Sequence, residues 1–132
     1  AKEKGLQVAI GSSSPHSWVA THANRLGIFH YFDHIICADD VGPGRTKPNP
    51  DIFLKALEQL NVRNDAAIVF EDSLNGVLAA RRAGIFVVAV PNPLTAKMGV
   101  SGDMTVSSLA ELSLQELSAK ILNTKDTTYT KV

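Results

Sequence analysis

The sequence has few of the features that identify a function at a glance. It contains one cysteine, Cys37, which excludes an internal disulfide and a metal cluster built on cysteines. Its 13 basic and 13 acidic side chains cancel, and without a block of one charge we expect neither nucleic acid nor an anionic membrane as a partner. No apolar run approaches the roughly 20 residues that a membrane-spanning helix needs. With a polar N-terminus that lacks the apolar stretch of a signal peptide, these absences predict a cytoplasmic protein.

The chain does contain short apolar runs, and these alternate with stretches that have the apolar periodicity of helices. Strands that alternate with helices favour an α/β protein with a parallel sheet and right-handed crossovers. The runs are almost continuously apolar, which predicts a sheet that is buried on both faces. The expected strands cover residues 6–10, 35–38, 66–70 and 86–90, and the expected helices between them cover residues 15–26, 50–60 and 74–83.

The length of 132 residues suits one domain with a single core. We expect that domain to cover residues 1–122 and to end with a helix over residues 114–122. Residues 123–132 are polar and show no periodicity, so we expect them to form a disordered tail.

Two of the expected helices begin with a capping residue followed by proline. Ser14 stands before Pro15, and Asn49 stands before Pro50. Both pairs fit a side-chain cap with proline at the first helical position. In the first of these helices Trp18 falls on the apolar face, which predicts a place in the core.

Two adjacent carboxylates, Glu71 and Asp72, end the third apolar run and stand directly before a helix. That position corresponds to the carboxyl edge of a sheet, where α/β proteins place their chemistry. Neighbouring carboxylates repel each other, so a cation, above all Mg²⁺, is a natural reason to keep them together. From these residues alone an alternative stays open: Asp72 or Ser73 caps the helix, and Glu71 is merely solvated.

A serine run and a lysine form the other candidate site. Ser12 and Ser13 follow the first expected strand, just ahead of a helix, where hydroxyls and free backbone N–H groups can hold phosphate. Lys47 lies two residues ahead of the helix that begins after Asn49, in a position to meet an anion. If the strands are parallel, these residues and the carboxylates converge at one edge of the sheet.

These motifs, taken in order, resemble the haloacid dehalogenase superfamily, and within it the β-phosphoglucomutase-like phosphatase branch. The resemblance covers roughly residues 5–112. It is carried by Ser12, by Thr46-Lys47-Pro48-Asn49-Pro50-Asp51, and by Phe70-Glu71-Asp72-Ser73-Leu74-Asn75-Gly76 with Ala79-Ala80 and Ala83-Gly84.

The resemblance implies a Rossmann-like, three-layer fold and Mg²⁺-dependent phosphoryl transfer through an aspartyl-phosphate. Carried over by position, Ser12 and Ser13 would bind the phosphoryl group, and Lys47 would neutralise its charge. Asp72 would ligate Mg²⁺, and Glu71 would assist in the metal shell. The substrate would be a small phosphorylated metabolite resembling a sugar phosphate, and the reaction its hydrolysis. This is physically coherent, because phosphoryl transfer depends on positioning and charge neutralisation.

The chain departs from the family pattern in one respect. Members carry an Asp-x-Asp motif at the end of their first strand, and no Asp-x-Asp occurs in this chain. The family places that strand at the centre of the sheet, between the strands expected here at residues 6–10 and 66–70. We therefore expect a core that lacks its central strand. Such a core would be the C-terminal part of a longer protein, or the partner of a separate N-terminal segment. Alone, we expect it to be inactive.

Three alternatives stay open at this point. The first is a phosphate-transferring mutase of the β-phosphoglucomutase type. The second is a signalling receiver domain, which also uses carboxylates, a hydroxyl and a lysine. Its lysine comes last, however, whereas Lys47 precedes Glu71 and Asp72. The third is a non-catalytic, truncated homologue, which the missing Asp-x-Asp favours.

Overall fold

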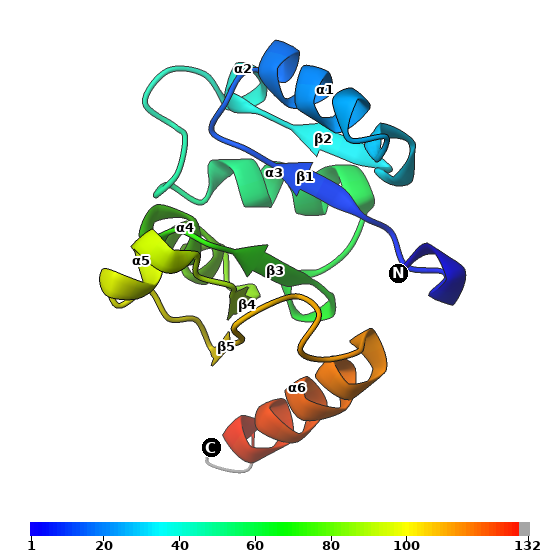
Figure 1. The fold of residues 1–132 in the computed structure, drawn as a ribbon, viewed down its shortest axis with the longest axis vertical. Coiled ribbons are helices and arrows are strands. Elements are labelled where there is room, and N and C mark those ends of the chain that lie inside the picture. The colour runs from blue at the N-terminus through cyan, green and yellow to red at the C-terminus, as the bar shows by residue number, and fades with distance from the viewer. Residues whose placement is uncertain (130–132) are drawn as a thin grey trace.

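The computed structural model describes residues 1–129, in which strands and helices alternate along the chain (Figure 1). The strands are β1 (Ala9–Gly11), β2 (His34–Ile36), β3 (Ile68–Glu71), β4 (Phe86–Ala89) and β5 (Met104–Thr105). The helices are α1 (His16–Arg25), α2 (Ala38–Val41), α3 (Asp51–Leu60), α4 (Leu74–Arg82), α5 (Pro93–Lys97) and α6 (Leu114–Tyr129), with short 3-10 turns at Lys2–Lys4, Phe29–Tyr31 and Asn64–Ala66.

The strands form two separate parallel half-sheets. Strands β1 and β2 pair to make the N-terminal half-sheet, and β3, β4 and β5 pair in that order to make the C-terminal half-sheet. Within residues 1–129, no strand pairing joins β1 to β3. The α/β class with parallel strands is confirmed. The break falls between β1 and β3, where the family pattern places a strand that this chain does not contain.

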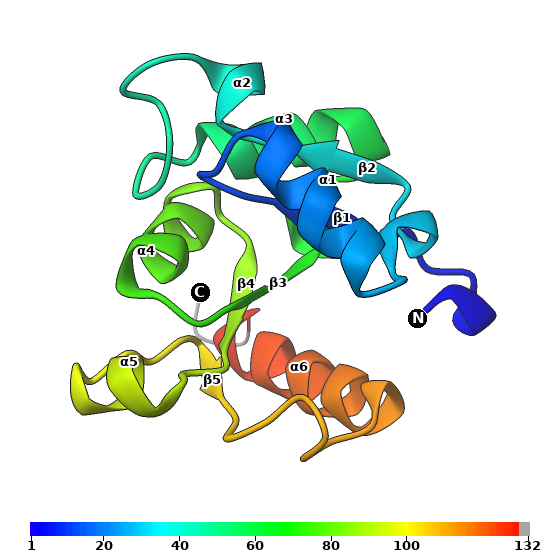
Figure 2. The ribbon, with the colours of Figure 1, turned by 45° about the horizontal axis from the view of Figure 1, so that its top comes forward.

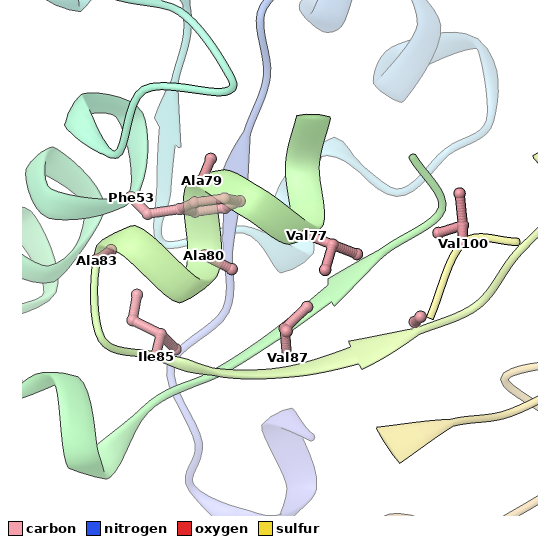
Figure 3. Packing of buried hydrophobic residues seen from close by; sticks show 9 residues of the cluster. Phe53, Val77, Ala79, Ala80, Ala83, Ile85, Val87 and Val100 are labelled. Atoms are coloured by element: carbon pink, nitrogen blue, oxygen red, sulfur yellow. The ribbon is translucent and has the colours of Figure 1, made fainter. Parts of the chain in front are cut away.

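Helix α3 joins the two half-sheets through its buried face. Ile52 packs with Ile36 of β2 in one apolar cluster. Phe53, the next residue, belongs to a second cluster with Ala79 of α4 and Val87 of β4 (Figure 3). One helix therefore holds both halves, although no backbone ladder connects them.

The C-terminal half-sheet is covered on both faces. Val87 packs into the cluster on the α4 side, whereas its neighbour Val88 packs against Leu117 and Ile121 of α6. Alternate residues of a strand point to opposite faces, so α4 and α6 must lie on opposite sides of β4. Helices α2 and α6 lie toward opposite ends of the molecule (Figures 1 and 2).

The start of α1 differs from the expectation. Ser14 does not cap it; instead the backbone N–H of His16 donates to Asp39 Oδ2 at 2.8 Å. The cap comes from a carboxylate 23 residues away, which local sequence cannot reveal. The predicted burial of Trp18 is also wrong, since this side chain is 55% exposed. Helical periodicity identifies an apolar face, but it does not show whether another element covers that face.

The start of α3 also lacks the predicted side-chain cap. The amide of Asn49 points back into the preceding loop, where Nδ2 donates to the carbonyl oxygen of Gly44 at 3.0 Å. The loop therefore competes with the helix for this side chain.

Two short helices were not predicted. Helix α2 lies between the strand expected over residues 35–38 and the helix expected over residues 50–60, and Asp40 stabilises its start by accepting a hydrogen bond from the backbone N–H of Cys37 at 2.7 Å. Helix α5 begins at Pro93, where Asn92 Oδ1 accepts from the backbone N–H groups of Leu94 at 2.9 Å and Thr95 at 3.0 Å. The Asn-Pro pair is the same start signal that was expected before α3.

The last helix is longer than predicted. Helix α6 runs to Tyr129, whereas the sequence placed its end at Leu122. No glycine or proline follows Leu122 to stop the helix. Over residues 123–129 this helix replaces the expected disordered tail. Residues 130–132 lie outside the described residues, and for them the tail stays a prediction.

None of the described helices is both long enough and apolar enough to cross a membrane.

Candidate active site

A cleft of about 700 Å³ opens between the carboxyl ends of β1 and β3. Both strands point their carboxyl ends into it, because Gly11 at the end of β1 and Glu71 at the end of β3 belong to its lining. The predicted site residues all line this one cleft: Ser12, Ser13, Lys47, Glu71 and Asp72. The convergence that the sequence predicted at one sheet edge is thus present in the structure.

The serine loop is held by hydrogen bonds at one wall of the cleft. The backbone N–H of Ser12 donates to the carbonyl oxygen of Ile36 at 2.9 Å. Ser12 Oγ accepts from the N–H of Ser14 at 3.1 Å, and Ser13 Oγ accepts from the N–H of Lys47 at 3.2 Å. In both of these bonds the hydroxyl is the acceptor, so its own O–H remains able to donate to a ligand.

Lys47 crosses the floor of the cleft from one half-sheet to the other. Its Nζ donates to the carbonyl oxygen of Gly11 at 2.8 Å and forms an ion pair with Glu71 Oε1. It also lies 4.8 Å from the ring centroid of Phe53. Only 12% of the lysine side chain is exposed. The contacts with Gly11 and Glu71 make Lys47, together with α3, a link between the two half-sheets.

Glu71 is enclosed on the other side of that ion pair. Its side chain is 8% exposed, and Oε2 accepts from Ser73 Oγ at 3.3 Å. A Cβ placed on Gly76 would lie 1.9 Å from Oε2, so any other residue at this position would force the carboxylate to move. Ser73 also caps α4, accepting from the N–H of Gly76 at 3.1 Å. The capping role considered for Ser73 is therefore present, but Glu71 is not a solvated carboxylate.

Asp72 is exposed at the rim of the cleft. Asn92 Nδ2 donates to its Oδ2 at a long 3.4 Å. In the described part of the chain no three His, Cys, Asp or Glu side chains cluster closely enough to hold a metal ion together. Mg²⁺ does not require such a cluster, because it keeps several waters and is commonly held by one or two carboxylates and substrate phosphate. The accessible carboxylate of Asp72 fits that mode.

A polar network lies next to the cleft. Asp39 and Asp40 both accept hydrogen bonds from backbone N–H groups. Asp40 additionally pairs with Nε2 of His16 at 2.7 Å, a contact that sequence reasoning missed. Burial raises the pKa of the Cys37 thiol to about 11, with further contributions from the charges of Asp40 and then Asp39. The raised pKa and the complete burial of Cys37 agree with a packing role for this cysteine.

Comparison with known proteins gives one family. The family model described as haloacid dehalogenase-like hydrolase matches residues 1–84. The chain is 41% identical over 115 residues to YhcW of Bacillus subtilis, covering 86% of this chain and 51% of that protein. It is 42% identical over 84 residues to the phosphorylated carbohydrates phosphatase of Thermotoga maritima, covering 64% of this chain and 38% of that protein. The chain thus spans about half the length, or less, of these curated relatives.

Solved structures agree with this result. CbbY from Rhodobacter sphaeroides in complex with phosphate superposes with a TM-score of 0.80 at 32% identity, covering 89% of this chain and 54% of that one. A β-phosphoglucomutase from Clostridium difficile gives a TM-score of 0.76 at 29% identity, over 90% of this chain and 50% of that one. Both matches are high enough to support a common fold.

Proposed function

The chain belongs to the haloacid dehalogenase-like hydrolase family, and from this premise we propose that it carries the phosphate- and magnesium-binding portion of a phosphatase. The substrate in this proposal is a small phosphorylated metabolite resembling a sugar phosphate. The names of the relatives support that class, since one acts on phosphorylated carbohydrates and another is a fructose-1-phosphate phosphatase of Escherichia coli.

The observation that carries the proposal is the meeting of two kinds of group in one cleft. Hydroxyls and an ammonium come from the N-terminal side, and carboxylates come from the end of β3. A phosphomonoester is an anion whose transfer needs charge neutralisation at the phosphoryl oxygens. The first set suits the phosphate, and the second suits the cation that accompanies it.

Each residue has a distinct task in the proposed reaction. Ser12 and Ser13 donate hydrogen bonds from their hydroxyl groups to phosphoryl oxygens, and Lys47 neutralises the charge that develops on these oxygens. At the Glu71–Asp72 end, Asp72 presents its carboxylate to Mg²⁺. The bound cation would supply further charge neutralisation on the phosphoryl group.

The nucleophile is not among the residues of this chain. In the proposal an aspartate of an N-terminal segment attacks phosphorus, and that segment inserts between β1 and β3. The exposed side chain of Phe70 on β3 supports this placement, because a side chain with 42% exposure is unusual in an apolar strand. The segment belongs either to a longer chain or to a separate one, and the present chain alone is inactive.

A mutase is the second candidate function. The structural similarity to a β-phosphoglucomutase supports it. Both reactions need residues that bind phosphate and a metal ion, and they differ in whether water or a sugar hydroxyl receives the phosphoryl group.

The test is an activity assay on the present chain joined to an N-terminal segment that carries Asp-x-Asp. We expect Mg²⁺-dependent release of phosphate from sugar phosphates, and a loss of about 100-fold or more for Asp72→Asn with the fold retained by circular dichroism. Glu58→Gln, a neutralised carboxylate on the exposed face of α3, is the control and should keep full activity. Activity retained by Asp72→Asn would contradict the proposal. So would Mg²⁺-dependent turnover by the present chain alone.

A further inference from the structure

The first turn of α4 contains the only Asn-Gly pair in the sequence, Asn75-Gly76. We propose that this pair is a deamidation site that the folded first turn of α4 protects, and that it reacts when this turn opens. The inference goes beyond the proposed function and does not depend on it, because it concerns a covalent change in the chain itself.

The reaction needs only the chain and solvent water. The backbone nitrogen of Gly76 loses its proton and bonds to Asn75 Cγ, the Cγ–Nδ2 bond breaks, and ammonia leaves. The resulting cyclic succinimide takes up water, and breaking either of its ring C–N bonds gives aspartate or isoaspartate. Glycine favours ring closure, because it has no Cβ to hinder the attacking nitrogen and its backbone is the most permissive.

The structure explains the glycine and leaves the asparagine accessible. A Cβ on Gly76 would lie 1.9 Å from Glu71 Oε2, so the packing of this carboxylate requires glycine at the second position of the pair. Asn75 is exposed and lines the cleft, where solvent reaches its amide. The labile pair is therefore a consequence of how the end of β3 packs against α4.

Three features of α4 oppose ring closure in the folded chain. The attacking nitrogen is engaged, since the N–H of Gly76 donates to Ser73 Oγ at 3.1 Å. Gly76 is also buried. The succinimide ring further requires a backbone torsion at Asn75 that an α-helix does not supply. Deamidation must therefore await a local opening, and its rate is the open-chain rate multiplied by the open fraction.

The first turn is the part of α4 where opening costs least, because helices fray at their ends. Its side-chain cap is Ser73. Loss of a serine cap typically raises the open fraction of a helix end by about 5-fold. Ser73 therefore controls how often the pair can react.

The products alter the cleft in two respects. Both place a carboxylate where the neutral amide of Asn75 lines the cleft, and isoaspartate also lengthens the main chain by one methylene in the first turn of α4. If the cleft binds phosphate as proposed, the added negative charge should weaken the binding of inorganic phosphate by about 3-fold or more. Unchanged phosphate affinity after complete deamidation would overturn this effect. If the fresh chain bound no phosphate, the proposed function would fail, and the rates at Asn75 would still decide the present inference.

The rates are measured by timed incubation of the 132-residue chain at mildly alkaline pH, followed by digestion with trypsin and mass spectrometry. The fragment of residues 64–81 contains Asn75 and also Asn64, whose following residue is Asp65. A synthetic peptide of residues 64–81 gives the open-chain rates. In this peptide Asn75 should convert about 10-fold or more faster than Asn64, because only Asn75 precedes glycine. Asn75 should convert about 10-fold or more slowly in the folded chain than in the peptide. Equal rates at the two asparagines of the peptide, or equal rates for Asn75 in peptide and chain, would overturn the inference.

Two variants locate the protection in the first turn of α4. Ser73→Ala should raise the rate at Asn75 by about 5-fold in the folded chain and leave the rate in the peptide unchanged. Asn92→Ala is the matched control, because it removes the side-chain cap of another helix, α5, and it should not change the rate at Asn75. An unchanged rate in Ser73→Ala, or an equal increase in both variants, would overturn the role of this turn.

Hydrogen exchange on the unmodified chain provides a test that does not depend on how the variants fold. Exchange of the Gly76 amide reports the same opening that exposes the attacking nitrogen. Its protection factor should therefore match the ratio of the peptide and chain deamidation rates within about 3-fold. A protection factor far above that ratio would mean that deamidation proceeds without opening of the turn, which would contradict the inference.

Discussion

Strands β3 and β4 run side by side in one half-sheet, yet β4 is buried over three of its four residues and β3 over none. Both strands are apolar, so composition does not explain the difference. Strand β4 has a strand on each side, whereas β3 has β4 alone, and β1 likewise has β2 alone. An apolar run therefore indicates which strands belong in the interior, whereas the burial of each strand depends on its neighbours. The cleft opens between β1 and β3, the two strands that each have a paired strand on one side only.

The same substitution on both strands measures how much the difference in burial contributes to stability. Val69 of β3 and Val87 of β4 are partners in the register, and Val87 is fully buried while Val69 is partly buried. We expect Val87→Ala to lower the free energy of unfolding by about 2.5 kcal/mol and Val69→Ala by about 1 kcal/mol. Urea denaturation measures both. Equal losses would mean that β3 is as enclosed as β4.

Glu71, at the carboxyl end of β3, differs from the rest of this strand, because its side chain is only 8% exposed. Gly76→Ala would place a Cβ against the Glu71 carboxylate. Overpacking of this kind costs about 1–3 kcal/mol, and we expect a cost of about 2–3 kcal/mol because the displaced carboxylate is paired with Lys47. Alanine gains about 1 kcal/mol over glycine in a helix, so the expected net loss in the free energy of unfolding is about 1–2 kcal/mol.

The control for this substitution is Asn75→Ala, at an exposed position one residue earlier in α4. It should change the free energy of unfolding by less than about 0.5 kcal/mol. A Gly76→Ala variant as stable as the unmodified chain would show that Glu71 can leave its place at no cost.

Part of this arrangement could be predicted from the sequence, because the alternation of strands and helices follows from local patterns and favours parallel strands. The parallel direction brings Ser12, Lys47 and Asp72 to one edge, and the structure places them there. What could not be predicted depends on contacts between distant residues. The cap that Asp39 provides for α1 is one such contact, and the enclosure of Glu71 by Lys47 is another.

The smallest expected effect concerns the N-terminal half-sheet, where Asp33 binds Lys2 at 2.7 Å and accepts the N–H of Val8 at 2.8 Å. The hydrogen bond from Lys2, followed by that from Val8, lowers the pKa of the Asp33 carboxyl. A carboxyl whose pKa is lower in the folded state stabilises the fold above its unfolded pKa, near 4, and loses that contribution as the pH falls through the folded pKa.

Asp33→Asn should therefore reduce the difference between the urea midpoints at pH 6 and pH 2.5. Lys2→Met should reduce it less, because Val8 still donates to Asp33. If Asp33→Asn left the pH dependence unchanged, the carboxylate would contribute nothing to stability in this half of the molecule.

The central claim is that the carboxyl ends of β1 and β3 together form one site for phosphate and its cation. Amide ¹H–¹⁵N NMR of the 132-residue chain, titrated with inorganic phosphate in the presence of Mg²⁺, tests it most directly. We predict saturable shifts that appear together at Ser12, Ser13, Lys47, Asp72 and Ser73, and that disappear in Lys47→Met. Shifts confined to other surfaces, or shifts that persist without the lysine, would contradict the account.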